Sequence, residues 1–137
     1  MTIDIKGIVQ ALVPQMLHTR REIHAHPELS FQEHRTSQLI SETLRSIGID
    51  VTDGIAGTGV VGLIAGAHSG PTLMIRADID ALPIHEASTS AYTSQNPGIM
   101  HACGHDGHTA VLLAVAKILS EQRSRIAGQI KLVFQPA

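Results

Sequence analysis

Apolar residues recur at helical spacing in two stretches near the start of the chain. Residues 8–26 follow this spacing and predict a helix. We expect it to begin near Pro14, because proline disrupts a helix interior but fits the first turn, and to end at the sequence HPE. The sequence SFQE has the form of a capping box, with Ser30 as N-cap and Glu33 reaching back. An apolar stripe follows it, and Gly48 is a natural stop, so we expect a second helix between them.

The pattern then changes to that of strands and returns once to that of a helix. The second and third β-rich runs are nearly all apolar, as expected for strands buried on both faces. The long aperiodic stretch after them is typical of a functional loop. This order of elements indicates an α/β layered fold with a mixed sheet, in one domain covering residues 1–137. The expected elements are strands at 49–55, 59–66 and 72–80, a loop at 80–106, a helix at 107–122 and a strand at 128–136.

The composition adds little to the fold and argues against several kinds of partner. With 43% hydrophobic and 16% charged residues, the chain is typical of a globular protein. A net charge of -2 and only two Phe and one Tyr argue against binding to nucleic acid. We expect no membrane partner and a cytoplasmic location, because the sequence has neither a long apolar run nor the features of a signal peptide. The single cysteine, Cys103, cannot form an internal disulfide.

The sequence IMHACGHDGHTA, residues 99–110, concentrates side chains that bind metals or move protons. Cys103 and His105 flank one glycine, so both could reach one ion, and a thiolate with an imidazole suits zinc. The other interpretation is that Cys103 is a small buried apolar residue and His105 a hydrogen-bonded polar one. Asp106 could orient a ligating imidazole. His108 could be a ligand, a substrate contact or a helix cap.

A second cluster, RADIDALP, places two carboxylates at the end of an apolar strand. Asp78 and Asp80 are two residues apart and therefore share a face, where they need a cation or hydrogen-bond donors. Arg76 could supply that charge in a salt bridge; alternatively, Asp80 fixes an imidazole or lies beside a metal centre. His24 and His26 of IHAHPE lie about 200° apart on a helix, so we expect a structural role for them rather than metal binding.

Four motifs together resemble one known family. RREIHAHPELSFQE, GTGVVGLIAG, RADIDALPI and MHACGHDGHTA occur in this order, and the resemblance extends from about residue 10 to the end of the chain. The family is that of metal-dependent amidohydrolases: hippurate hydrolases, N-acyl-amino-acid deacylases and indole-acetyl-amino-acid hydrolases, in the aminoacylase and carboxypeptidase clan of two-metal exopeptidases. The resemblance implies a three-layer, mixed-sheet, zinc-exopeptidase-like catalytic domain. Residues 1–137 would form its N-terminal portion, without the lid or dimerisation domain and the C-terminal part.

The resemblance also implies the site and its chemistry. Two divalent ions, zinc or manganese with cobalt or nickel as possibilities, would be held by Cys103 and His105, with Cys103 in the place of a bridging carboxylate. Asp80 matches the aspartate that supports the metals, and Asp78 lies where relatives have a ligating histidine. The remaining residues expected around the ions or the substrate are Arg76, His101, Asp106 and His108.

The implied reaction is hydrolysis of a small N-acyl amino acid, with a glutamate moving the proton. In this family two adjacent glutamates, an acid/base and a metal ligand, directly follow the sequence FQPA, which ends this chain at Ala137. We therefore expect the isolated chain to be inactive and intact relatives to form homo-oligomers. The alternatives are a truncated, non-catalytic pseudoenzyme that binds metal weakly and a redox sensor built on Cys103.

Overall fold

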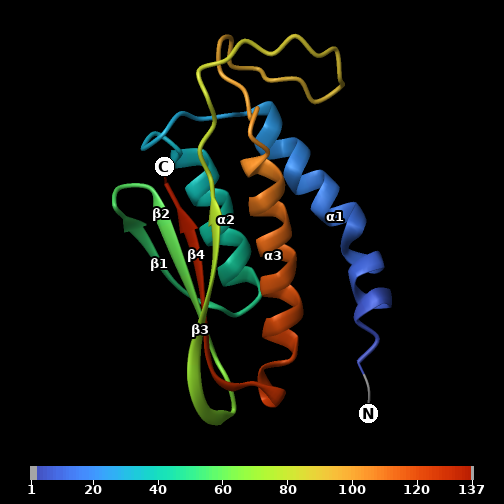
Figure 1. Cartoon of the computed structure of the whole chain (residues 1–137), viewed down its shortest axis with the longest axis vertical. Coiled ribbons are helices and arrows are strands. Elements are labelled where there is room, and N and C mark those ends of the chain that lie inside the picture. Colours follow the sequence, from blue (N-terminus) through green and yellow to red (C-terminus); the bar gives the residue numbers. More distant parts are fainter. Residues whose placement is uncertain (1–2, 137) are drawn as a thin grey trace.

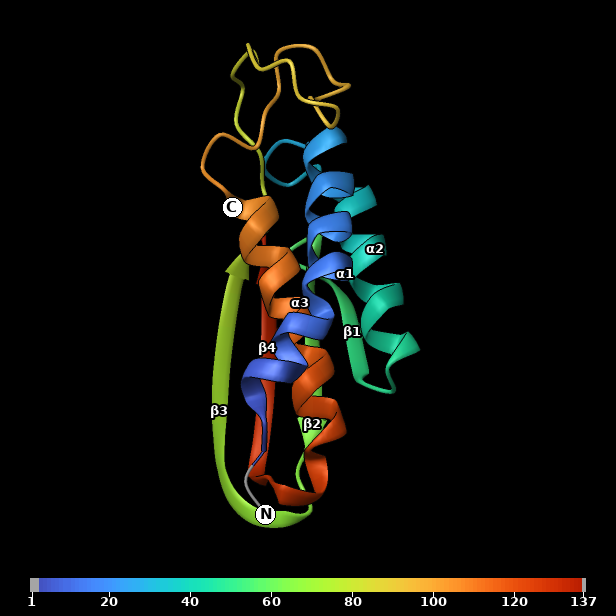
Figure 2. The same ribbon diagram turned by 90° about the vertical axis from the view of Figure 1, so that its right-hand side faces the viewer.

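The structure, a computed structural model, describes residues 3–136 and confirms an α/β fold with a mixed sheet (Figure 1). Helices α2 and α3 pack on one face of the sheet, and α1 packs against α3 (Figure 2). No helix of the described residues is long and apolar enough to cross a membrane. The elements are α1 (Ile5–Ala25), α2 (His34–Ser46), β1 (Asp50–Ile55), β2 (Gly59–Ala65), β3 (His68–Asp78), α3 (His105–Glu121), the short 3-10 helix η1 (Arg123–Arg125) and β4 (Ala127–Gln135).

The strands lie in the order β1-β2-β4-β3. The first two neighbouring pairs are antiparallel, and the pair of β3 with β4 is parallel. Asp78 therefore lies opposite Gln135, at the edge of the sheet formed by the carboxyl ends of β3 and β4. The N-terminus of α3 returns to the same edge after the long connection 79–104, so side chains from several segments meet there (Figure 1). Open α/β sheets commonly place their sites at such an edge.

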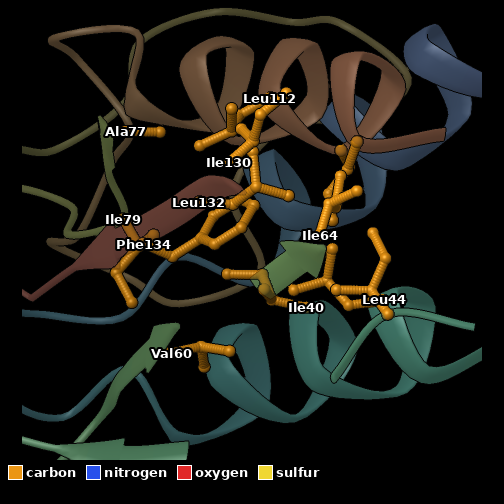
Figure 3. Close-up of a cluster of buried hydrophobic side chains, with 13 residues drawn as sticks. Ile40, Leu44, Val60, Ile64, Ala77, Ile79, Leu112, Ile130, Leu132 and Phe134 are labelled. Atoms are coloured by element: carbon orange, nitrogen blue, oxygen red, sulfur yellow. The ribbon is translucent and has the colours of Figure 1, made fainter. Parts of the chain in front are cut away.

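One hydrophobic core fixes the helices to the sheet (Figure 3). Burial alternates along β4, and its residues Leu132 and Phe134 are fully enclosed. From α2, Ile40 and Leu44 face the same core because they lie one helical turn apart. The site is therefore built on elements whose positions are set by close packing. The buried side chains of the core are Ile40, Leu44, Ile49, Val60, Ile64, Ala77, Ile79, Leu112, Leu113, Ala116, Ile130, Leu132 and Phe134.

The predicted starts of the first two helices are wrong. Helix α1 begins at Ile5, with the Asp4 side chain accepting a hydrogen bond from a backbone N–H of the first turn, and it continues through Pro14. A proline removes one helical hydrogen bond, a loss that the turns on both sides of it outweigh here. Helix α2 begins at His34, so the expected capping box does not form. The carboxylate of Glu28 caps this helix instead, accepting hydrogen bonds from the backbone N–H groups of residues 35 and 36.

The apolar sequence of the third strand predicts burial on both faces, but the structure shows this strand largely exposed. It ends at Asp78, it has β4 as its only neighbour in the described sheet, and Leu73 and Met74 are 58% and 63% exposed. The run of apolar residues does not reveal that β3 is the outer strand of the described sheet, because the neighbours of a strand are set by topology. Helix α3 starts two residues before the position expected, which brings His105 into its first turn.

Candidate metal centre

Three side chains converge where β3 ends and α3 begins. Asp78, His105 and His108 each offer an oxygen or nitrogen atom, and these atoms lie within 4.8 Å of one another. His108 Nδ1 is 2.6 Å from Asp78 Oδ1, and His105 Nε2 is 3.5 Å from Asp78 Oδ2. Carboxylate and imidazole groups at this spacing are a suitable set of ligands for a divalent ion.

A glycine and the helical repeat bring the two histidines to this position. Gly104 precedes α3 with φ 85°, a left-handed conformation that turns the chain into the helix and that other residues rarely adopt. His105 and His108 are three residues apart in the first turn and therefore lie on one side of the helix. Their ring centroids are 5.4 Å apart.

Asp80 fixes the orientation of the His105 ring. His105 Nδ1 lies 2.8 Å from Asp80 Oδ1 and 2.9 Å from the Asp80 carbonyl oxygen. Both partners are acceptors, so Nδ1 carries a proton, and Nε2 lies on the side of Asp78. The Ser30 hydroxyl donates to the other oxygen of Asp80 at 3.3 Å. The interpretation in which Asp80 fixes an imidazole thus agrees with the geometry, and this arrangement is common around metal-binding histidines.

Asp78 is ionised and partly enclosed. Burial raises the pKa of Asp78, but the hydrogen bond from His108 and the charge of His105 outweigh this effect and hold it below its ordinary value. Arg76 Nη1 also lies 3.5 Å from Asp78 Oδ2, so the salt bridge expected from the sequence is present for this carboxylate. Arg76 and His108 are about half exposed and form the outer side of the cluster.

Cys103 lies just before this cluster, at the end of the long connection. Its thiol is free and exposed, and the set of described side chains able to share one ion does not include it. Its role as a ligand beside His105 stays a prediction. His101 is deeply buried, and neither of its ring nitrogens has a hydrogen-bond partner among residues 3–136. Burial, the largest of several causes, lowers the pKa of His101 to about 4, so its ring is neutral at pH 7.

Asp106 contacts an imidazole, but that of His24 rather than of His105. It is fully buried, and its Oδ2 atom lies 2.8 Å from His24 Nδ1 and 3.2 Å from Arg20 Nε. The other nitrogen of His24 lies 3.1 Å from Glu86 Oε1. The sequence had suggested only a structural role for His24, and nothing in the aperiodic stretch around Glu86 marked that residue.

Comparison with known proteins points to one family. Residues 74–137 match the sequence pattern described as Peptidase family M20/M25/M40. It is 48% identical over 134 residues to an N-acyl-L-amino acid amidohydrolase of Geobacillus stearothermophilus, covering 98% of this chain and 36% of that protein. Thermostable carboxypeptidase 2 of Saccharolobus solfataricus is 46% identical over 134 residues, 97% of this chain and 34% of its own length.

A solved member of the M20 family has the same fold. A Bacillus subtilis protein described as a dinuclear metal binding peptidase superposes with a TM-score of 0.89 at 43% identity, over 93% of this chain and 36% of that one. The family resemblance inferred from the four motifs is therefore confirmed. The chain spans about a third of the length of these relatives.

Proposed function

We propose that the protein hydrolyses the amide bond of small N-acyl amino acids with two divalent metal ions, and that this chain supplies the first part of the metal site. The observation that carries the proposal is the meeting of Asp78, His105 and His108 at one edge of the sheet, with Asp80 behind the His105 ring. The names of the relatives, an amidohydrolase and a carboxypeptidase, support the same chemistry. Zinc or manganese suits these donors, and cobalt or nickel is also compatible with them.

The residues of the cluster fit such ions. His105 presents its Nε2 on the side of the ionised Asp78, so an imidazole nitrogen and a carboxylate face the same space. A thiolate from Cys103 would add a soft ligand. Bound divalent ions of this kind polarise a carbonyl group and lower the pKa of water.

The remaining residues orient these ligands and the substrate. Asp80 holds the proton on His105 Nδ1 and thereby keeps the ring in one orientation. Arg76 and His108 lie at the exposed side of the cluster, where they would face the carboxylate of an N-acyl amino acid. The acidic pair that completes catalysis in the family would come from beyond this third of the structure. A cytoplasmic location and homo-oligomers of the intact protein stay predictions.

A chimeric enzyme tests the function. Residues 1–137 would replace the matching segment of the Geobacillus stearothermophilus amidohydrolase, and release of amino acid from hippurate and N-acetyl amino acids would be measured with added zinc or manganese. The chimera should turn over one or more of these substrates, and its Cys103→Ala and His105→Ala variants should be inactive. Asp53→Ala, which changes a surface carboxylate paired with Arg45, is the matched control.

Two results would contradict the proposal. One is a folded, metal-loaded chimera that releases no amino acid from any N-acyl amino acid tested. The other is full activity in the His105→Ala variant. The 137-residue chain itself should bind zinc, because Asp78, His105 and His108 all lie within it.

A further inference from the structure

His24 connects two segments that carry the proposed metal donors. It lies in the last turn of α1, is 5% exposed, and places one ring nitrogen on each of two buried carboxylates. Nδ1 lies 2.8 Å from Asp106 Oδ2, and Nε2 lies 3.1 Å from Glu86 Oε1. Asp106 directly follows His105 in the first turn of α3, whereas Glu86 belongs to the connection 79–104 that ends at Cys103 and Gly104.

Glu86 in turn holds the outward part of that connection. Its Oε2 accepts a hydrogen bond from the backbone N–H of Ser94 at 2.6 Å, and its Oε1 also accepts from the Ser88 hydroxyl. The next residue along the connection, Gln95, donates its backbone N–H to the carbonyl of Ala25 at 2.8 Å. The connection is therefore attached to the end of α1 at several points. Of the groups that make these attachments, the His24 side chain also contacts α3, at Asp106.

The contacts hold the His24 ring between two buried carboxylates, one on each ring nitrogen. The Arg20 guanidinium adds a positive charge beside Asp106. Buried carboxylates without such partners are strongly unfavourable, so the bridge constrains both segments.

We propose that His24 is a positioning residue of the metal centre. Its imidazole joins the first turn of α3 to the 79–104 connection and thereby sets the distance between the proposed metal ligands of these two segments. This inference rests on the proposed function for the identity of the centre. His24 itself touches neither Asp78 nor His105 through any hydrogen bond of the described structure. Its effect on metal binding is transmitted by Asp106 on one side and Glu86 on the other.

Four variants of the 137-residue chain separate positioning from a general loss of stability. In His24→Gln the amide can reach only one of the two carboxylates. His26→Gln is the matched control, because His26 is two residues away and the polar contacts of its ring, within residues 3–136, are to Glu22 of its own helix. In Glu86→Gln the amide can still form a hydrogen bond with the His24 ring, so the bridge survives. Glu86→Ala removes the bridge while leaving α1 unchanged.

Two readouts would be measured on chains shown to be folded by circular dichroism. The first is the Kd for zinc, from competition with a chromophoric chelator. We expect about tenfold or more weaker binding in His24→Gln and Glu86→Ala, and a change of less than about twofold in His26→Gln and Glu86→Gln. The second is the 15N–1H signal of His105 Nδ1 in metal-free protein, which should shift or broaden in the first two variants alone.

The outcomes distinguish this inference from the proposed function. Wild-type zinc affinity and an unchanged His105 signal in folded His24→Gln would overturn the positioning role, and the same result in Glu86→Ala would do so if His24→Gln does not fold. A wild-type chain that binds no zinc would refute the proposed function, while the His105 signal would still decide whether His24 positions that ring.

Discussion

Replacing Asp80 with alanine isolates the contribution of the group that orients His105. The Asp80 side chain is buried and accepts hydrogen bonds from His105 Nδ1 at 2.8 Å and from the Ser30 hydroxyl at 3.3 Å. Changes to residues that orient a metal-binding histidine typically weaken binding by about 10- to 100-fold. The Asp80 carbonyl oxygen, 2.9 Å from the same nitrogen, remains as an acceptor in the variant.

We therefore expect a loss near the lower end of that range, about tenfold or about 1.4 kcal/mol in the free energy of zinc binding. The assay is a competition titration of zinc against a chelator, on the 137-residue chain at pH 7. Asp80→Asn keeps an oxygen in place and should lose less than Asp80→Ala, while Asp53→Ala, at a surface ion pair, should bind as the wild type does. Wild-type affinity in a folded Asp80→Ala variant would refute the reasoning that this carboxylate prepares His105 for a metal ion.

Three further predictions concern stability, each measured by urea unfolding in the presence of a chelator. The pKa of His101 lies at about 4 in the folded chain and at about 6.5 in the unfolded chain. Between about pH 6.5 and 4 the His101 ring therefore binds a proton in the unfolded state but not in the folded state. Stability should fall as the pH drops from about 6.5 to 4, by up to about 1.4 kcal/mol per unit, and His101→Gln should lessen that slope; an equal slope in both proteins would contradict the prediction. Gly104→Ala, at φ 85°, should cost about 1–2 kcal/mol, and no loss would show that the turn into α3 does not require glycine. Phe134→Ala, at a fully buried position of β4, should cost about 3–5 kcal/mol, whereas a loss below about 1 kcal/mol would mean that the core is not closely packed there.

The sequence predicted the parts of the fold that follow from local periodicity. The apolar stripe of α2 and the aperiodic stretch before α3 both have the predicted character. The start of α1 was misjudged because Pro14 was weighed alone, and the cap of α2 because Glu28, which accepts its N–H groups, lies outside the expected motif. The exposure of β3 depends on which strands flank it, and periodicity within one strand does not contain that information.

The candidate site was partly predictable for a similar reason. Asp78, Asp80 and His105 lie in short motifs whose spacing already suggests a shared site, and the structure brings these three together. The contact of Asp106 with His24 joins residues 82 positions apart, and that of His24 with Glu86 joins residues 62 apart. Such partners are set by the packing of α1 on α3 and by the path of the long connection, which no local pattern specifies.

The most direct test of the central claim is an anomalous-difference map of zinc-loaded crystals of the chain, collected at the zinc absorption edge. We expect a peak bonded to His105 Nε2 at about 2.0–2.1 Å, with Asp78 or Cys103 as a further ligand. A zinc peak elsewhere with none at His105, or a His105 ring turned so that Nδ1 binds the ion, would contradict it.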